Sequence, residues 1–207
     1  HPGTGLQASA TNHLISALAG GRHDNAVAYI SPSFGGVTVA YNHARVSELA
    51  GTSGNTDAHG DLLSASYANG PISAGAIYTR VTLDGANNNV KEWGLRAGYD
   101  FGVVKLQAQY QRAKDEAITT GSDSLWLVSA TVPVGAKVAV IGEFGHTSRK
   151  STTTADNVNA ATVAATYSLS KRTTAYAGMK AVRVQSADLG TQGTDTNTYV
   201  MGLRHMF

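Results

Sequence analysis

Trp93-Gly94-Leu95-Arg96-Ala97-Gly98-Tyr99-Asp100-Phe101 shows most clearly the pattern from which the fold of this chain can be predicted. Its odd-numbered residues are all apolar or aromatic, and its even-numbered residues are Gly, Arg, Gly and Asp. Successive side chains of a β-strand point to opposite faces, so this alternation predicts a strand with one apolar and one polar face. The next stretch, 104–111, repeats the pattern.

The same alternation recurs along most of the chain in segments of about ten residues. It predicts an all-β, antiparallel structure whose strands lie near 25–32, 36–44, 60–69, 71–81, 90–102, 103–113, 122–133, 135–147, 157–169, 171–184 and 196–207.

The connections between these segments fall into two alternating kinds. Short turns lie at 32–35, 69–71, 101–102, 133–135 and 168–171, and longer polar loops lie at about 45–59, 82–89, 114–121, 148–156 and 185–195. Tight turns at one end and longer loops at the other are typical of transmembrane β-barrels of the outer membrane. Tyrosines near both strand ends agree with the two aromatic girdles of such a barrel.

Composition excludes other classes of protein. The chain has 207 residues, no cysteine and only 14 % charged residues. No apolar run approaches the roughly 18 residues that a spanning helix needs, which excludes a helical membrane protein. The formal net charge of +2, without any block of Lys or Arg, gives no indication of nucleic-acid binding.

The polar parity of the strands carries too many charges for a packed core, which could bury them only in strict pairs. We therefore expect the apolar parity to face lipid and the polar parity to face a water-filled lumen. The residues expected to line it are Glu92, Arg96, Asp100, Lys105, Gln107, Gln109, Gln111, Glu143, Lys180 and Arg204. Their four cations against three carboxylates suggest a weak preference for anions.

Both ends of the chain differ from the strands between them. Residues 10–21 have helix-like spacing, with Thr11 or Asn12 as a possible N-cap and Gly20 as a possible stop. This helix could belong to a loop folded into a barrel, to a plug, or to the membrane surface. The last segment ends in Phe207, with Tyr199, Met201 and Leu203 on the same parity.

Four blocks of sequence resemble the general porins of β-proteobacteria: residues 24–36, 99–102, 169–174 and 202–207. The resemblance runs from about Arg22 to Phe207. It implies a 16-stranded barrel assembled as homotrimers, of which strands six to sixteen lie at 25–207 and five N-terminal strands are missing. Residues 1–24 would then be the end of the inward-folded constriction loop, with Arg22 beside the pore.

The resemblance also implies partners. The terminal strand is similar to the signal that the barrel-assembly machinery recognises, carried by Tyr199, Met201, Leu203 and Phe207. Outer-membrane lipid and lipopolysaccharide would surround the barrel, and no cofactor is implied. The family often has Arg or Lys at the position of Ala28, so alanine here argues against strong anion selectivity.

Three other functions were weighed. An adhesin or structural barrel would use its loops, which are modest in length here. A soluble β-sandwich that binds a ligand is a more distant reading. An enzyme would need a rim site such as His146 with Asp156, but the chain has no Gly-x-Ser-x-Gly or phosphate-binding motif. The seven histidines show no metal-ligand spacing.

Overall fold

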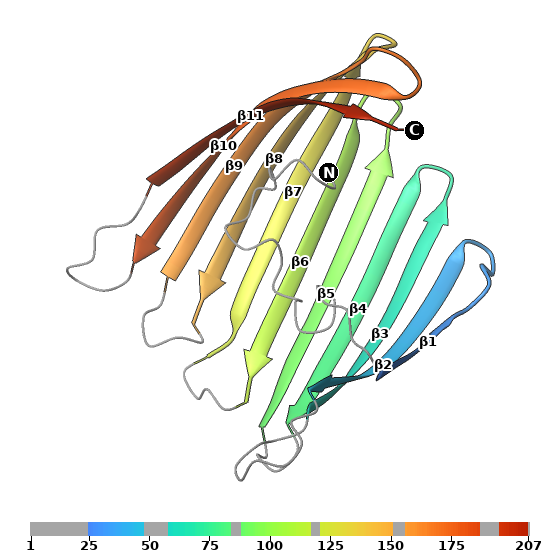
Figure 1. Ribbon diagram of the computed structural model, residues 1–207, viewed down its shortest axis with the longest axis vertical. Helices are drawn as coiled ribbons and strands as arrows, with labels where there is room; N and C mark the ends of the chain where they lie inside the picture. The colour runs from blue at the N-terminus through green and yellow to red at the C-terminus, as the bar shows by residue number, and fades with distance from the viewer. Residues whose placement is uncertain are drawn as a thin grey trace.

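A computed structural model describes residues 25–47, 58–83, 88–116, 121–150, 156–186 and 195–206. They form one antiparallel sheet in which each strand pairs with its neighbours in the chain (Figure 1). The strands are β1 Asn25–Ile30, β2 Val37–Ser47, β3 Ala58–Asn69, β4 Ile72–Leu83, β5 Asn88–Asp100, β6 Lys105–Asp115, β7 Asp123–Val134, β8 Val138–Arg149, β9 Asp156–Ser168, β10 Thr173–Ser186 and β11 Asp195–His205.

The predicted all-β, antiparallel architecture of eleven strands is confirmed. The sheet is open, because β1 and β11 do not pair with each other within the described ranges. The expected helix at 10–21, Arg22 and Phe207 lie outside the described residues, and the division of the chain at residue 24 stays a prediction. No helix in the described part is long and apolar enough to span a membrane.

Strand register assigns every side chain to one of two faces, since directly opposed residues share a face. Arg96 opposes Gly75 on β4 and Gln109 on β6, whereas Leu95 opposes Ala76 and Tyr110. We call the face of Arg96 the polar face and the face of Leu95 the apolar face. Ten ladders carry this assignment from β1 to β11, with one register shift between β2 and β3 at Arg45/Ser47.

Burial differs sharply between the two faces. Every buried residue of the described part lies on the polar face, including Thr79, Glu92, Leu125 and Thr147. The apolar face holds nearly all the large exposed apolar side chains of the strands, with Leu95 53 % and Val163 56 % exposed. The sheet is visibly curved (Figure 1), and curvature crowds the side chains of the concave side, so we take the polar face as concave.

Most of the strands, though not β1 or β7, extend further toward the long loops than the sequence predicted. The β4–β5 ladder continues to Leu83 opposite Asn88, so that connection is 84–87 and not 82–89. It is therefore no longer than the connection at 101–104, and the expected strict alternation of loop lengths is wrong at this point. The reason is that ladder hydrogen bonds join backbone groups and do not require apolar side chains.

Glycines close the tight connections. Gly36, Gly70, Gly102 and Gly135 all have positive φ, which other residues adopt only with strain. Gly36 has a second constraint, because a Cβ added there would lie 2.5 Å from the carbonyl oxygen of Ala68 on β3. That oxygen belongs to the backbone and has little freedom to move.

Gly36→Ala should therefore destabilise the fold more than Gly70→Ala, whose added Cβ meets no atom within 4 Å. We expect a loss of about 3 kcal/mol for Gly36→Ala and about 1 kcal/mol for Gly70→Ala in the free energy of unfolding. Urea titration of the protein refolded in detergent micelles measures both. Equal losses would contradict the close approach of Gly36 to β3.

Candidate functional site

The polar face brings together all the pore-lining candidates that fall in the described part. They are Glu92, Arg96, Asp100, Lys105, Gln107, Gln109, Gln111, Glu143, Lys180 and Arg204. Tyr199, Met201 and Leu203 lie on the opposite, apolar face of β11, and all three are highly exposed. That the first group lines a pore, and that the second is an assembly signal, stay predictions.

Arg96 lies near the middle of this face and is exposed. Its side chain covers Gly75, where an added Cβ would lie 2.7 Å from Arg96 Nε. Beside it is a hollow of about 380 Å³ lined by both polar and apolar groups, including Ser64, Ser66 and Gln109. Glycine at position 75 thus provides the space in which the guanidinium lies along the sheet.

Two further charge groupings lie along the same face. Asp100 directly opposes Lys105, and opposite charges in that position stabilise a strand pair. Glu143 and Lys180 lie in one cross-strand row, with Thr162 between them. Positive and negative groups therefore alternate across this face and are not sorted into two separate halves.

Glu92 lies deeper than the sequence prediction supposed. It is on the polar face but only 3 % exposed, and its Oε2 accepts a hydrogen bond of 2.9 Å from Thr79 Oγ1. Thr79 itself is fully buried. A carboxylate in such surroundings holds two strands together and offers little charge to solvent.

The structure does not bring together the rim pair considered for catalysis. His146 lies on the apolar face, where its Nδ1 is 2.8 Å from Asn159 Oδ1, whereas Asp156 opposes Arg149 on the polar face. Within the described ranges, no group of three His, Asp or Glu side chains could hold a metal ion.

Sequence reasoning missed the outward-facing charges at the long-loop ends of β4–β6. Arg80, Lys91 and Lys114 lie on the apolar face, in one cross-strand row. Arg80 and Lys91 fall inside the predicted strands 71–81 and 90–102, and Lys114 lies one residue beyond the predicted strand 103–113, yet no face was assigned to any of them. Their parity is that of Tyr78, Trp93 and Tyr110, which would have placed them on the apolar face.

Comparison with known proteins identifies the family. The family model described as "Gram-negative porin" matches residues 2–187. The chain belongs to this family of porins. The outer membrane porin protein 32 of Delftia acidovorans is 27 % identical to this porin over 204 residues, covering 90 % of this chain and 57 % of its own length. A Bordetella pertussis outer membrane porin is 25 % identical over 205 residues, covering 79 % and 53 %.

Solved structures agree on the fold. An anion-selective porin from Comamonas acidovorans superposes with a TM-score of 0.69 at 22 % identity, covering 89 % of this chain and 60 % of its own. OmpT, an outer membrane protein of Vibrio cholerae, gives 0.66 at 12 % identity, covering 88 % and 64 %. This porin chain therefore has the fold of outer-membrane barrels, is an outer-membrane protein, and spans somewhat more than half the length of the curated relatives it matches.

A matched pair of threonines tests the polar face. Thr79→Val removes the donor to the buried Glu92 and should lower the free energy of unfolding by about 1–3 kcal/mol. Thr162 is 4 % exposed, and its Oγ1 has no hydrogen-bond partner in the described structure, so Thr162→Val should be neutral or stabilising. Thermal unfolding in detergent micelles compares them, and equal destabilisation would argue against the Thr79–Glu92 bond.

Proposed function

We propose that this protein is a general-diffusion porin, a passive channel for small hydrophilic solutes and ions with a weak preference for anions. The observation that carries the proposal is the sorting of the sheet: one face is apolar and exposed, while the opposite face holds the charged side chains. An apolar face of this extent is stable only against lipid. The polar face then lines water.

Charge along the polar face supports the preference for anions. Arg96, Lys105 and Arg204 are exposed, as is Asp100, while Glu92 is buried. Because the Glu92 carboxylate is buried, the charge that the polar face presents to solvent is more positive than the residue count suggests. The similar Comamonas protein is described as an anion-selective porin, which agrees with this direction.

An adhesin or structural barrel is the alternative. Such a protein would depend on long loops, and the β4–β5 connection is only 84–87. The proposed channel is not an enzyme: the relatives are porins, and the one catalytic pair that the sequence suggested lies on opposite faces.

We extend the proposal to assembly. A homotrimer is supported by the Vibrio OmpT structure described as a trimer form. The barrel-assembly machinery would recognise Tyr199, Met201, Leu203 and Phe207, the first three of which are exposed on β11, a strand at the edge of the sheet. The proposed surroundings are outer-membrane lipid and lipopolysaccharide.

Reversal of the Arg96 charge tests the channel. In a planar bilayer under a salt gradient, Arg96→Glu should move the reversal potential toward cation preference, because the group lies on the proposed pore wall. Arg183→Glu is the matched control: it makes the same charge change on the apolar face of β10, where residue 183 opposes Asn159. We expect it to leave the potential nearly unchanged, since this side chain lies on the face opposite to the proposed pore wall.

Two results would contradict the proposal. Equal shifts of the reversal potential in Arg96→Glu and Arg183→Glu would contradict the proposal that the polar face controls ion preference. The absence of any conductance from correctly inserted native protein would favour the adhesin or structural barrel.

A further inference from the structure

Three cations lie side by side on the apolar face, near the long-loop ends of β4, β5 and β6. Arg80 directly opposes Lys91, and Lys91 directly opposes Lys114. We call these three residues the cation row. With strands about 4.8 Å apart, the row spans about 10 Å. Like charges in directly opposed positions destabilise a sheet, so this arrangement is costly unless an anion lies against it.

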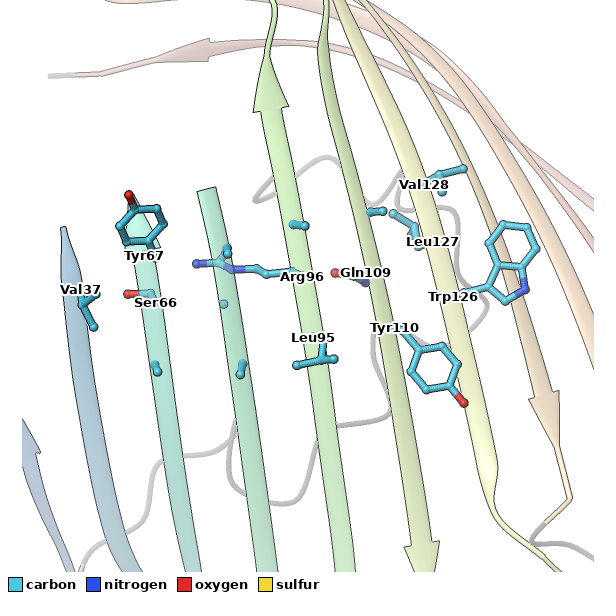
Figure 2. Close-up of a pocket in the computed structure, with 16 residues that line it drawn as sticks. Val37, Ser66, Tyr67, Leu95, Arg96, Gln109, Tyr110, Trp126, Leu127 and Val128 are labelled. Carbon is cyan, nitrogen blue, oxygen red and sulfur yellow. The ribbon is translucent and has the colours of Figure 1, made fainter. Parts of the chain in front are cut away.

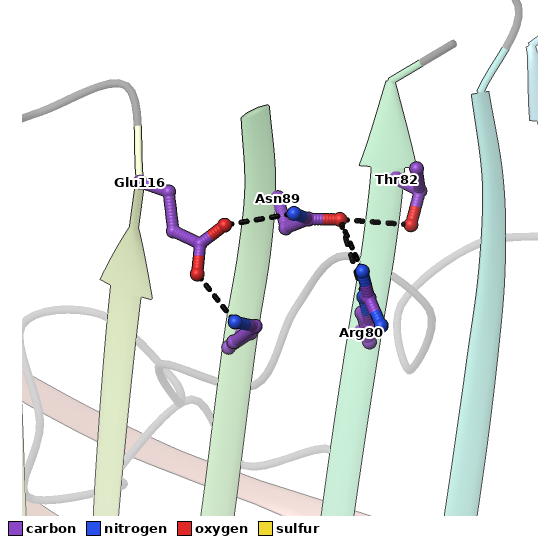
Figure 3. Close-up of polar contacts among 5 residues, drawn as sticks. Arg80, Thr82, Asn89 and Glu116 are labelled. Atoms are coloured by element: carbon purple, nitrogen blue, oxygen red, sulfur yellow. Dashed lines mark hydrogen bonds and ion pairs between the residues drawn. The ribbon is translucent and has the colours of Figure 1, made fainter. Parts of the chain in front are cut away.

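Among the described residues, the contacts that hold the cation row involve Arg80 and Lys91 (Figure 3). The Lys91 ammonium pairs with the Glu116 carboxylate, which also accepts a 2.7 Å bond from Asn89 Nδ2. Asn89 Oδ1 in turn accepts bonds of 3.1 Å from both Nε and Nη2 of Arg80 and of 3.0 Å from Thr82 Oγ1. These contacts orient Arg80 and Lys91, but of the five guanidinium N–H donors Asn89 takes only two.

Among the described residues, the charge around the cation row is positive. Arg112 lies on the same face of β6, bonded through Nε to Ser122 Oγ at 2.9 Å. In the described part of this row, Asp61 lies opposite Arg80, and it already accepts the Tyr41 hydroxyl at 2.6 Å and faces His43 Nδ1 at 2.9 Å. The bonds from Lys91 and Asn89 lower the pKa of Glu116, which therefore stays ionised through mildly acidic pH.

The position of the row along the strands indicates where it lies in the membrane. Tyr78 and Trp93 oppose each other on the same face, two residues or about 7 Å closer to the strand centres. The Trp93 and Tyr110 rings are 5.4 Å apart. Aromatic rings of this kind mark the headgroup level, so the cation row lies at or just outside it, on the side of the longer loops that faces the cell exterior.

An apolar hollow of about 670 Å³ lies on the same face, closer to the membrane centre. Its lining includes the small residues Ala76, Ala97 and Ala108. The larger side chains of Tyr67, Tyr110 and Trp126 also line it (Figure 2). Ala76 is four residues, or about 13 Å, below Arg80 on β4. A cationic site above an apolar hollow has the amphipathic form of a phosphorylated lipid.

We propose that the cation row binds the phosphate groups of lipopolysaccharide and that the hollow below it receives one of its acyl chains. This goes beyond conduction and requires only that the apolar face contacts the outer leaflet, so loss of conductance with retained lipid binding would leave it standing. The binding is directional, since the phosphates must lie at the long-loop ends of the strands.

The test uses native full-length protein in detergent micelles and the fluorescence anisotropy of labelled lipopolysaccharide. Arg80→Gln, Lys91→Gln and Lys114→Gln combined should weaken binding about a hundredfold, because each surface cation near anionic lipid contributes about one factor of five. The matched control combines Lys137→Gln, Lys171→Gln and Arg172→Gln, which make the same charge change at the tight-turn ends. The affinity of this control should stay within about twofold of native, because its three cations lie at the ends of the strands opposite to the proposed phosphate site.

Three further arms separate the sources of binding. Dephosphorylated lipopolysaccharide should bind native protein as weakly as the triple variant binds the intact lipid. Glu116→Gln removes the carboxylate that pairs with Lys91 and leaves the three cations in place. This variant should bind lipopolysaccharide at least as tightly as native protein. Ala97→Phe, which fills the hollow and leaves every cation in place, should weaken binding several-fold.

Several results would overturn the proposal. They are native affinity in the folded triple variant, an equal loss in the turn-end control, and undiminished affinity for the dephosphorylated lipid. If Ala97→Phe bound lipopolysaccharide with native affinity, the proposal that the hollow receives an acyl chain would be wrong. Equal affinity for vesicles of phosphatidylglycerol would replace a lipopolysaccharide site by a general attraction to anionic membranes.

Discussion

The pleat of the β-strand determines which face of this sheet each side chain occupies. In a bilayer every backbone N–H and C=O must be bonded within the protein, and the ten ladders between β1 and β11 do this for the interior of the sheet, with one irregularity between β2 and β3 at Arg45/Ser47. The pleat then sends alternate side chains to opposite faces, so a sequence that alternates apolar and polar residues makes a sheet with two chemically different sides. Leu95 and Arg96 are adjacent in the chain, yet Leu95 lies on the face proposed to contact lipid and Arg96 on the face proposed to contact water.

The two faces therefore differ in burial and in chemical character. On the polar face, curvature crowds the side chains, and it withdraws Glu92 from solvent while Arg96 remains exposed over Gly75. On the apolar face the character changes along the strand, from aliphatic and aromatic residues to charged ones at the long-loop ends. The pleat thus explains the chemical difference between the two faces, and with it the proposed channel wall.

Much of this follows from the sequence, and the exceptions have physical reasons. Period-two alternation predicts all eleven strands and the faces of Arg96 and Lys105, because side-chain parity survives small errors in the strand ends. It does not predict that Glu92 is buried, since depth depends on curvature and on Thr79 of a neighbouring strand. It also ends β4 too early, because polar residues such as Thr82 look like loop although the backbone ladder includes them.

The most direct test of this account uses the absence of cysteine from all 207 residues. Single cysteines introduced at each position from 93 to 100, in protein inserted in membranes, would be treated with a water-soluble thiol reagent. We predict modification at 96 and 100, which are exposed on the polar face, and protection at 93, 95, 97 and 99. Uniform modification along the strand, or modification of the odd positions, would contradict the assignment of the apolar face to lipid.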